Sequence, residues 1–183
     1  MKKQVFLFAT IAAMLFCGCQ FSTGNHKDLR SGLSFSYNGF RVQDVFLTDS
    51  GSTTKRTDNS VAMNTRVDIL VKGISGYTPK DGKVLPGMSV TVTDTQGNNI
   101  LNAEDVLAQI NPAPEEDASA LQSYVAIGEP MKPGNTYHIK VHVWDKYNLK
   151  NTLDANVDIV VKNKNQNNKY GLEYGKQNIE NDY

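Results

Sequence analysis

The two cysteines of the chain are the residues whose chemistry the sequence raises first. Cys17 and Cys19 stand one residue apart in the stretch LFCGCQ, directly after an apolar run. A redox or metal site built on them would need a further cysteine to complete it, and the chain has no other. The pair therefore suggests processing of the N-terminus rather than redox or metal chemistry.

The apolar run has the layout of a secretory signal peptide. Lys2 and Lys3 precede apolar residues 5–16, and this run is shorter than the roughly 20 residues that a membrane-spanning helix needs. We expect residues 1–18 to be a signal peptide that is removed. The alternative is an uncleaved hydrophobic N-terminus that keeps both cysteines.

The end of this segment resembles a bacterial lipobox, with Gly18 as the small residue before an acylated Cys19. The resemblance implies that Cys19 carries a diacylglyceryl group, and two or three acyl chains on one residue anchor a protein stably in a membrane. Surface-displayed lipoproteins of Bacteroidetes-type bacteria often carry an acidic cluster behind the cysteine, whereas here Asp28 is alone. The resemblance therefore implies an outer-membrane lipoprotein that faces the periplasm, with surface display as the alternative.

The histidines are the residues that catalysis or transition-metal binding would most often use. His26 lies near the N-terminus, whereas His138 and His142 lie on one expected strand. Four residues of extended chain separate their Cα atoms by about 13 Å, which is too far for both to bind one ion. We expect two solvent-facing histidines, and the sequence contains no G-x-S-x-G, H-E-x-x-H or P-loop motif.

Calcium is the metal that the loop carboxylates could bind. Asp94 and Asp145 each end an expected strand, and acidic residues 115–117 lie between strands. Calcium takes six to eight oxygen ligands, so carboxylates from several loops at one end of a sandwich could combine. The alternative is that each aspartate serves its own turn.

Aromatic side chains provide the candidate partner-binding site. Trp144, the one tryptophan of the chain, continues the outward register of His138 and His142, and Tyr147 follows in the next loop. Trp144, Tyr147 and His142 together could stack on a sugar or dock a protein. The alternative is that Trp144 packs under a neighbouring segment.

The elements that must position these residues are strands. Residues 66–71, 88–92, 137–143 and 157–161 alternate apolar and polar side chains, and turn residues separate them. Strands with one apolar and one polar face predict antiparallel sheets packed around a common core. We therefore expect an all-β sandwich of about seven strands over residues 33–162.

One segment identifies the type of sandwich. The stretch PMKPGNTYHIKVHVWD is similar to the entry to the penultimate strand of an immunoglobulin or fibronectin III domain, with Tyr137 in the place of the tyrosine corner. This resemblance covers residues 121–162 and implies a fold, not a function. Residues 102–120 contain two prolines and predict a short helical or irregular excursion.

Two polar segments flank the expected domain. Residues 19–32 contain Gly and Ser and predict a flexible tether. Residues 163–183 are rich in Asn and Lys and predict a disordered tail, with a docking peptide around Tyr170 and Tyr174 as the alternative. The chain has 19 basic and 19 acidic residues, so its charge offers no reason to bind nucleic acid.

These observations favour a non-enzymatic, lipid-anchored envelope protein whose sandwich binds another protein, within a multi-protein assembly for example. A surface glycan-binding lipoprotein is the first alternative, and it needs coplanar exposed aromatic rings. A hydrolase with a site assembled from loops is the second alternative. We expect no cofactor other than the calcium considered above.

Overall fold

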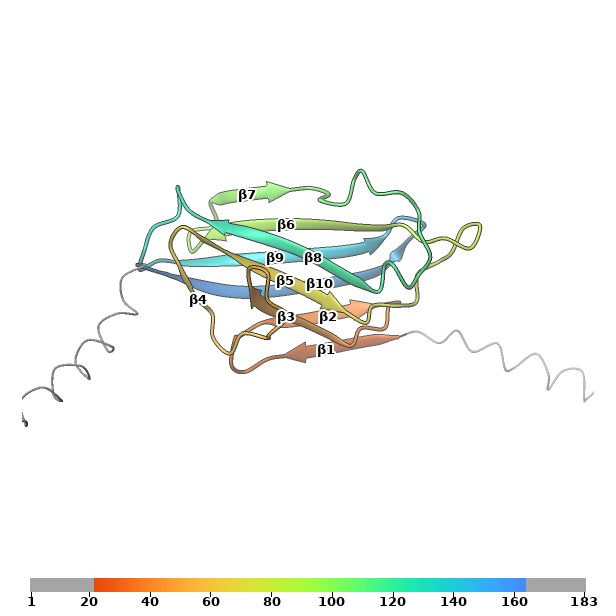
Figure 1. The fold of residues 1–183 in the computed structure, drawn as a ribbon, viewed down its shortest axis with the longest axis horizontal. Helices are drawn as coiled ribbons and strands as arrows, with labels where there is room; N and C mark the ends of the chain where they lie inside the picture. The colour runs from red at the N-terminus through yellow and green to blue at the C-terminus, as the bar shows by residue number, and fades with distance from the viewer. Residues whose placement is uncertain (1–21, 164–183) are drawn as a thin grey trace, which may run out of the picture.

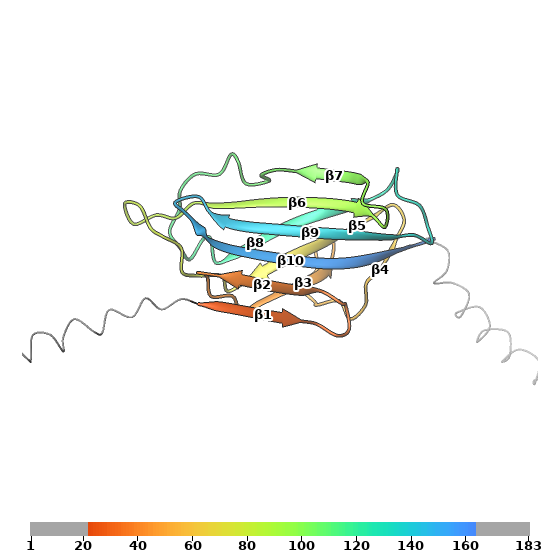
Figure 2. The same ribbon diagram turned by 180° about the vertical axis from the view of Figure 1, so that it is seen from behind.

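The computed structural model describes residues 22–163, and they form a sandwich of two sheets (Figure 1 and Figure 2). The larger sheet has seven strands in the order β1-β2-β10-β9-β6-β7, with β4 paired to β10, and the smaller sheet has the order β3-β5-β8. All pairs are antiparallel except β4 with β10. The strands are β1 (Thr23–Lys27), β2 (Ser34–Asn38), β3 (Asp44–Asp49), β4 (Ser60–Ala62), β5 (Thr65–Lys72), β6 (Pro86–Asp94), β7 (Asn99–Ala103), β8 (Ala120–Ile127), β9 (Thr136–Asp145) and β10 (Asn148–Lys162).

The expectation of an all-β, antiparallel sandwich is confirmed, with ten strands instead of about seven. The expected signal peptide, the lipidation site Cys19 and most of the expected tail lie outside the described residues. None of the described residues belongs to a helix that is long and apolar enough to cross a membrane.

Alternation of side chains along the strands builds the core. In β9 the inward residues Tyr137, Ile139, Val141 and Val143 are all buried, as the sequence predicts. The backbone N–H of Lys132 donates a 2.8 Å hydrogen bond to the Tyr137 hydroxyl, which is the contact that defines a tyrosine corner. The sandwich of this chain therefore has this immunoglobulin-type feature where the sequence resemblance places it.

The sandwich begins earlier than the sequence suggests. Strand β1 pairs along its whole length with β2, and the His26 ring stacks on Phe35 with 5.4 Å between centroids. The Asp28 carboxylate lies 3.2 Å from the Lys55 ammonium of a distant loop. The prediction of a flexible tether is thus wrong for residues 23–32, because pairing with β2 orders a segment whose own composition is polar.

The expected excursion over residues 102–120 begins with the end of β7 and ends at the first residue of β8, and residues 104–119 between them are irregular, which decides between the two expected forms. After β7 the chain makes turns, and no described residue of this segment is helical. The Asp105 carboxylate accepts hydrogen bonds from the backbone N–H groups of Leu107 (2.9 Å) and of Met88 in β6 (3.2 Å). The carboxylate thereby fixes the segment on the larger sheet in a turn, and two prolines follow.

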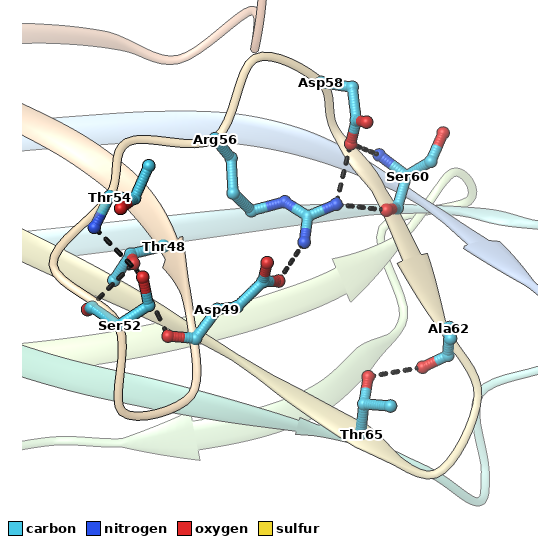
Figure 3. A network of polar contacts seen from close by, with 9 residues as sticks. All are labelled: Thr48, Asp49, Ser52, Thr54, Arg56, Asp58, Ser60, Ala62 and Thr65. Atoms are coloured by element: carbon cyan, nitrogen blue, oxygen red, sulfur yellow. Dashed lines mark hydrogen bonds and ion pairs between the residues drawn. The ribbon is translucent and has the colours of Figure 1, made fainter.

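A polar network holds the loop of residues 50–59 against the outer strand of the smaller sheet (Figure 3). The Arg56 guanidinium donates to Asp49, to Asp58 (2.7 Å) and to the carbonyl of Ser60 (2.5 Å). The backbone N–H of Arg56 donates to the carbonyl of Leu47 in β3. The loop therefore covers the outer edge of β3.

Candidate functional site

The predicted aromatic site is partly taken up by packing within the sheet. Trp144 is half-buried and lies over Gly87 of β6, its register partner, so closely that a Cβ atom at Gly87 would overlap the indole ring. The His142 ring stacks on Trp144, with 5.5 Å between centroids. Trp144 therefore packs on the outer face of its own sheet, against β6, and this packing accounts for its partial burial.

Tyr147 lies in the turn that follows β9. It is half-buried, and the Lys80 ammonium lies 5.9 Å from the centre of its ring. No aromatic stacking joins Tyr147 to Trp144 in the described part of the chain. The structure thus brings His142 and Trp144 together, but it does not add Tyr147 to a common flat platform.

Each strand histidine pairs with an aspartate of β10. The Nδ1 atom of His138 lies 2.5 Å from Asp158, and that of His142 lies 3.0 Å from Asp154. Both are directly opposed cross-strand pairs on the outer face of the larger sheet. Each histidine therefore has its own carboxylate, and the two do not converge on one site.

The two calcium candidates lie at opposite ends of the sheet. Asp94 faces Tyr137 in the β6–β9 register, whereas Asp145 faces Pro86, eight residues away along β6. Eight residues of extended chain span about 26 Å. Among residues 22–163, no group of three or more His, Cys, Asp or Glu side chains is arranged to hold a metal ion.

Each of these aspartates instead accepts hydrogen bonds from nearby backbone and side-chain groups. The side-chain amide and backbone N–H of Asn98, with the N–H of Gln96, donate to Asp94 and hold the pKa of its carboxyl below the usual value. Asp145 is completely buried and accepts hydrogen bonds from Thr78 N–H (2.7 Å), Tyr147 N–H (2.9 Å) and the Asn151 amide (3.3 Å). Asp94 is thus held within its own turn, as the turn alternative predicts, whereas Asp145 joins its own turn to Thr78 and to Asn151 of β10.

The strongest candidate site is an apolar cleft that the sequence did not predict. It lies between β7, the last strand of the larger sheet, and β8, the last strand of the smaller sheet, and its volume is about 570 Å³. We name it the β7–β8 cleft. Its lining residues are Val90, Ile100, Leu101, Ala103, Val106, Leu107, Gln122, Ser123, Tyr124, Ala126, Gly128, Glu129, Pro130 and Met131.

Apolar side chains are exposed at the β7–β8 cleft. Tyr124 is 60% exposed, Val106 45% and Leu101 38%, and Ile110, 40% exposed, follows in the same loop. Six large apolar side chains are exposed among the described residues, and three of them, Leu101, Val106 and Tyr124, line the cleft. Exposed apolar side chains that gather around a concave surface make that surface a candidate binding site.

Ser123 adds an unsatisfied polar atom to the wall of the cleft. It points inward from β8, is 5% exposed, and its hydroxyl has no hydrogen-bond partner among the described residues. Buried hydroxyl groups are nearly always hydrogen-bonded, because leaving one unpaired costs free energy. The wall of the cleft therefore contains one buried hydroxyl group, that of Ser123, without a hydrogen-bond partner among the described residues.

An ion pair holds the loop that forms the upper wall of this cleft. The Lys146 ammonium lies 2.8 Å from Asp105 and donates to the carbonyl of Leu107 (3.0 Å). Burial would raise the pKa of Asp105, but the hydrogen bonds from Lys146 and from the backbone N–H groups of Met88 and Leu107 lower it below its ordinary value. The charged form of Asp105 therefore stabilises the fold.

We expect Asp105→Asn to lower the free energy of unfolding by about 1 kcal/mol at pH 7, through loss of charge-assisted hydrogen bonds. A carboxyl whose pKa is depressed in the folded state contributes fully above its unfolded pKa of about 3.9, and this contribution is lost as the pH falls through the folded pKa. The difference between wild type and variant, measured by urea denaturation, should therefore shrink below about pH 4. Asp117→Asn, at an exposed position, is the matched control, and an equal loss there would contradict the argument.

The fold and the cleft define the class of this chain as a two-sheet β-sandwich that is open along one side. No protein-family model matches the chain, and no curated protein matches its sequence. Two structures of superoxide reductase (neelaredoxin) from Ignicoccus hospitalis align with TM-scores of 0.36 and 0.38 at 10% and 9% identity. These alignments cover 64% and 66% of this chain and 80% and 82% of the neelaredoxin chains.

Chicken MD-1 complexed with lipid IVa aligns with a TM-score of 0.31 at 12% identity, over 76% of this chain and 99% of the MD-1 chain. All of these likenesses concern the β-sandwich arrangement alone.

Proposed function

We propose that this chain is a non-enzymatic, lipid-anchored envelope protein whose sandwich binds another protein at the β7–β8 cleft. The observation that carries the proposal is the exposed apolar surface of this cleft, at Leu101, Val106 and Tyr124. Apolar and aromatic side chains around a concave surface are typical of the centre of protein interfaces. The anchor is the acylated Cys19 of the lipobox, and the proposed location is the periplasmic face of the outer membrane.

The arrangement of the other candidate residues supports a binding role over the alternatives. Sugar binding would need coplanar exposed rings, whereas Trp144 is half-buried on its own sheet and, among the described residues, does not stack with Tyr147. Asp145, which a loop-built hydrolase could use, has its carboxylate oxygens occupied by loop donors. We therefore place the partner at the β7–β8 cleft, where apolar side chains are exposed to solvent.

The proposal is tested by crosslinking in the envelope of the native host. We expect a protein that is crosslinked to the wild-type chain to be lost from the double variant Leu101→Asp/Tyr124→Asp, because charges replace apolar side chains at the cleft. Leu149→Asp is the matched control, since Leu149 is 72% exposed, belongs to β10 and does not line the cleft.

Whole-cell protease treatment of the same strains reports the side of the membrane. A partner retained by both variants would refute the cleft as the binding site. Digestion of the protein on intact cells would replace the periplasmic location with surface display.

A further inference from the structure

The outer strands of the two sheets are unequally protected against pairing with another chain. Natural proteins protect such edges with charged residues, short strands or covering loops, because an edge strand carries unpaired N–H and C=O groups. Strand β1 is short and carries Lys27, and the loop of residues 50–59 covers β3. Strand β7 is short, and its pairing with β6 is irregular.

Strand β8 has none of these protections. Its eight residues, ALQSYVAI, include no charged side chain and no proline, and among the described residues it pairs with β5 alone. It also forms one wall of the β7–β8 cleft. A long, uncharged and unpaired edge beside an apolar cleft is the geometry that accepts an added strand.

The backbone of β8 shows which of its groups are free. The carbonyls of Ser119 and Ile127 accept hydrogen bonds from Ile74 and Asn64, which flank β5, so the odd-numbered residues turn their backbone groups toward β5. Backbone groups alternate in direction along a strand. The N–H and C=O groups that face the free edge are therefore those of Ala120, Gln122, Tyr124 and Ala126.

The charges around β8 indicate what kind of strand would fit. Acidic residues 115–117 precede β8 and Glu129 follows it, and all of them are exposed. Basic Arg66 and Lys72 of β5 lie opposite Ala126 and Ala120, on the side of β8 away from its free edge. Two copies of this chain that paired through β8 about a two-fold axis would place Glu129 of one beside residues 115–117 of the other. This like-charge contact disfavours a second copy and favours a partner strand with basic ends.

Resting on the proposed function, we propose that the partner supplies an extended segment that pairs with the free edge of β8. The segment has an uncharged middle, places one apolar side chain in the β7–β8 cleft, and carries Lys or Arg at its ends. The main-chain hydrogen bonds provide affinity, and the cleft selects the side chain.

The test selects ligands from a phage-displayed library of random ten-residue peptides on the purified chain. We expect enriched peptides to alternate apolar and polar residues between basic ends. Ala126→Pro removes one free N–H and should weaken binding of the synthetic peptides about tenfold, whereas Ala126→Ser keeps that N–H and should bind as wild type does. N-methylation of alternate peptide residues leaves the protein unchanged and should weaken binding by a similar factor.

Other results would overturn the inference. These are an absence of enriched peptides, enriched peptides without alternation, or binding that survives both Ala126→Pro and N-methylation. A wild-type dimer that Ala126→Pro converts to a monomer would assign the edge to a second copy. The two proposals fail separately. The crosslinking experiment tests the side chains of Leu101 and Tyr124, whereas the peptide experiment tests the backbone of β8. Loss of the crosslinked partner from Leu101→Asp/Tyr124→Asp would therefore support the cleft even if the peptide experiment overturned strand pairing.

Discussion

Replacement of Asp145 by alanine is expected to lower the free energy of unfolding by about 3 kcal/mol, among the largest effects of any single polar substitution in the chain. The carboxylate is completely buried and accepts hydrogen bonds from three donors, on Thr78, Tyr147 and Asn151. In the variant these donors lose their acceptor, and each unsatisfied buried donor costs about 1 kcal/mol or more. Urea denaturation followed by Trp144 fluorescence would measure the loss.

Asp94→Ala is the matched control for this prediction. Asp94 also accepts hydrogen bonds from its loop, but these lie in an exposed hairpin where water can replace the carboxylate. We expect its loss of stability to be clearly smaller. If the two variants were equally stable, or if calcium shifted the wild-type transition and not that of Asp145→Ala, Asp145 would not be the structural acceptor described above.

The second large effect is expected at Gly87, where there is no room for a side chain. Gly87→Val would place its Cβ well inside the van der Waals radius of the Trp144 indole. The indole must move off the sheet, and we expect a loss of about 3 kcal/mol in the free energy of unfolding. The emission of Trp144 should shift to the red, because the displaced ring becomes exposed to water.

Two further variants separate this clash from a general effect on the fold. In a Trp144→Ala background the additional cost of Gly87→Val should fall markedly, since the side chain that it meets is gone. Gly128→Ala is the control glycine, because no atom lies within 4 Å of the position that its Cβ would take and its backbone is not left-handed. An equal cost of Gly87→Val in both backgrounds would show that Trp144 is not the cause.

Local sequence patterns were sufficient to predict β5, β6, β9 and the second half of β10, together with their inward faces. The alternation in residues 137–143 identified Tyr137, Ile139, Val141 and Val143 as core residues, and all four are buried. This works because successive side chains of a strand point to opposite faces, so burial on one face imposes a period of two on the sequence itself.

The candidate site could not be predicted in the same way. Trp144 was correctly placed on the outer face, but its half-burial depends on Gly87, which lies 57 positions earlier and becomes its neighbour through the β6–β9 register. In the same way, β1 looks like a polar tether until β2 pairs with it. Register between strands is a long-range property that no local pattern contains.

By itself, therefore, the sequence determined the lipobox resemblance, the all-β class and the inward face of the main strands, because each depends on residues close together in the chain. The tertiary structure alone decided that Asp94 and Asp145 lie far apart, that β8 is an unprotected edge, and that a cleft opens beside it. The cleft lies between the last strands of two different sheets, so its walls meet only when the sandwich closes.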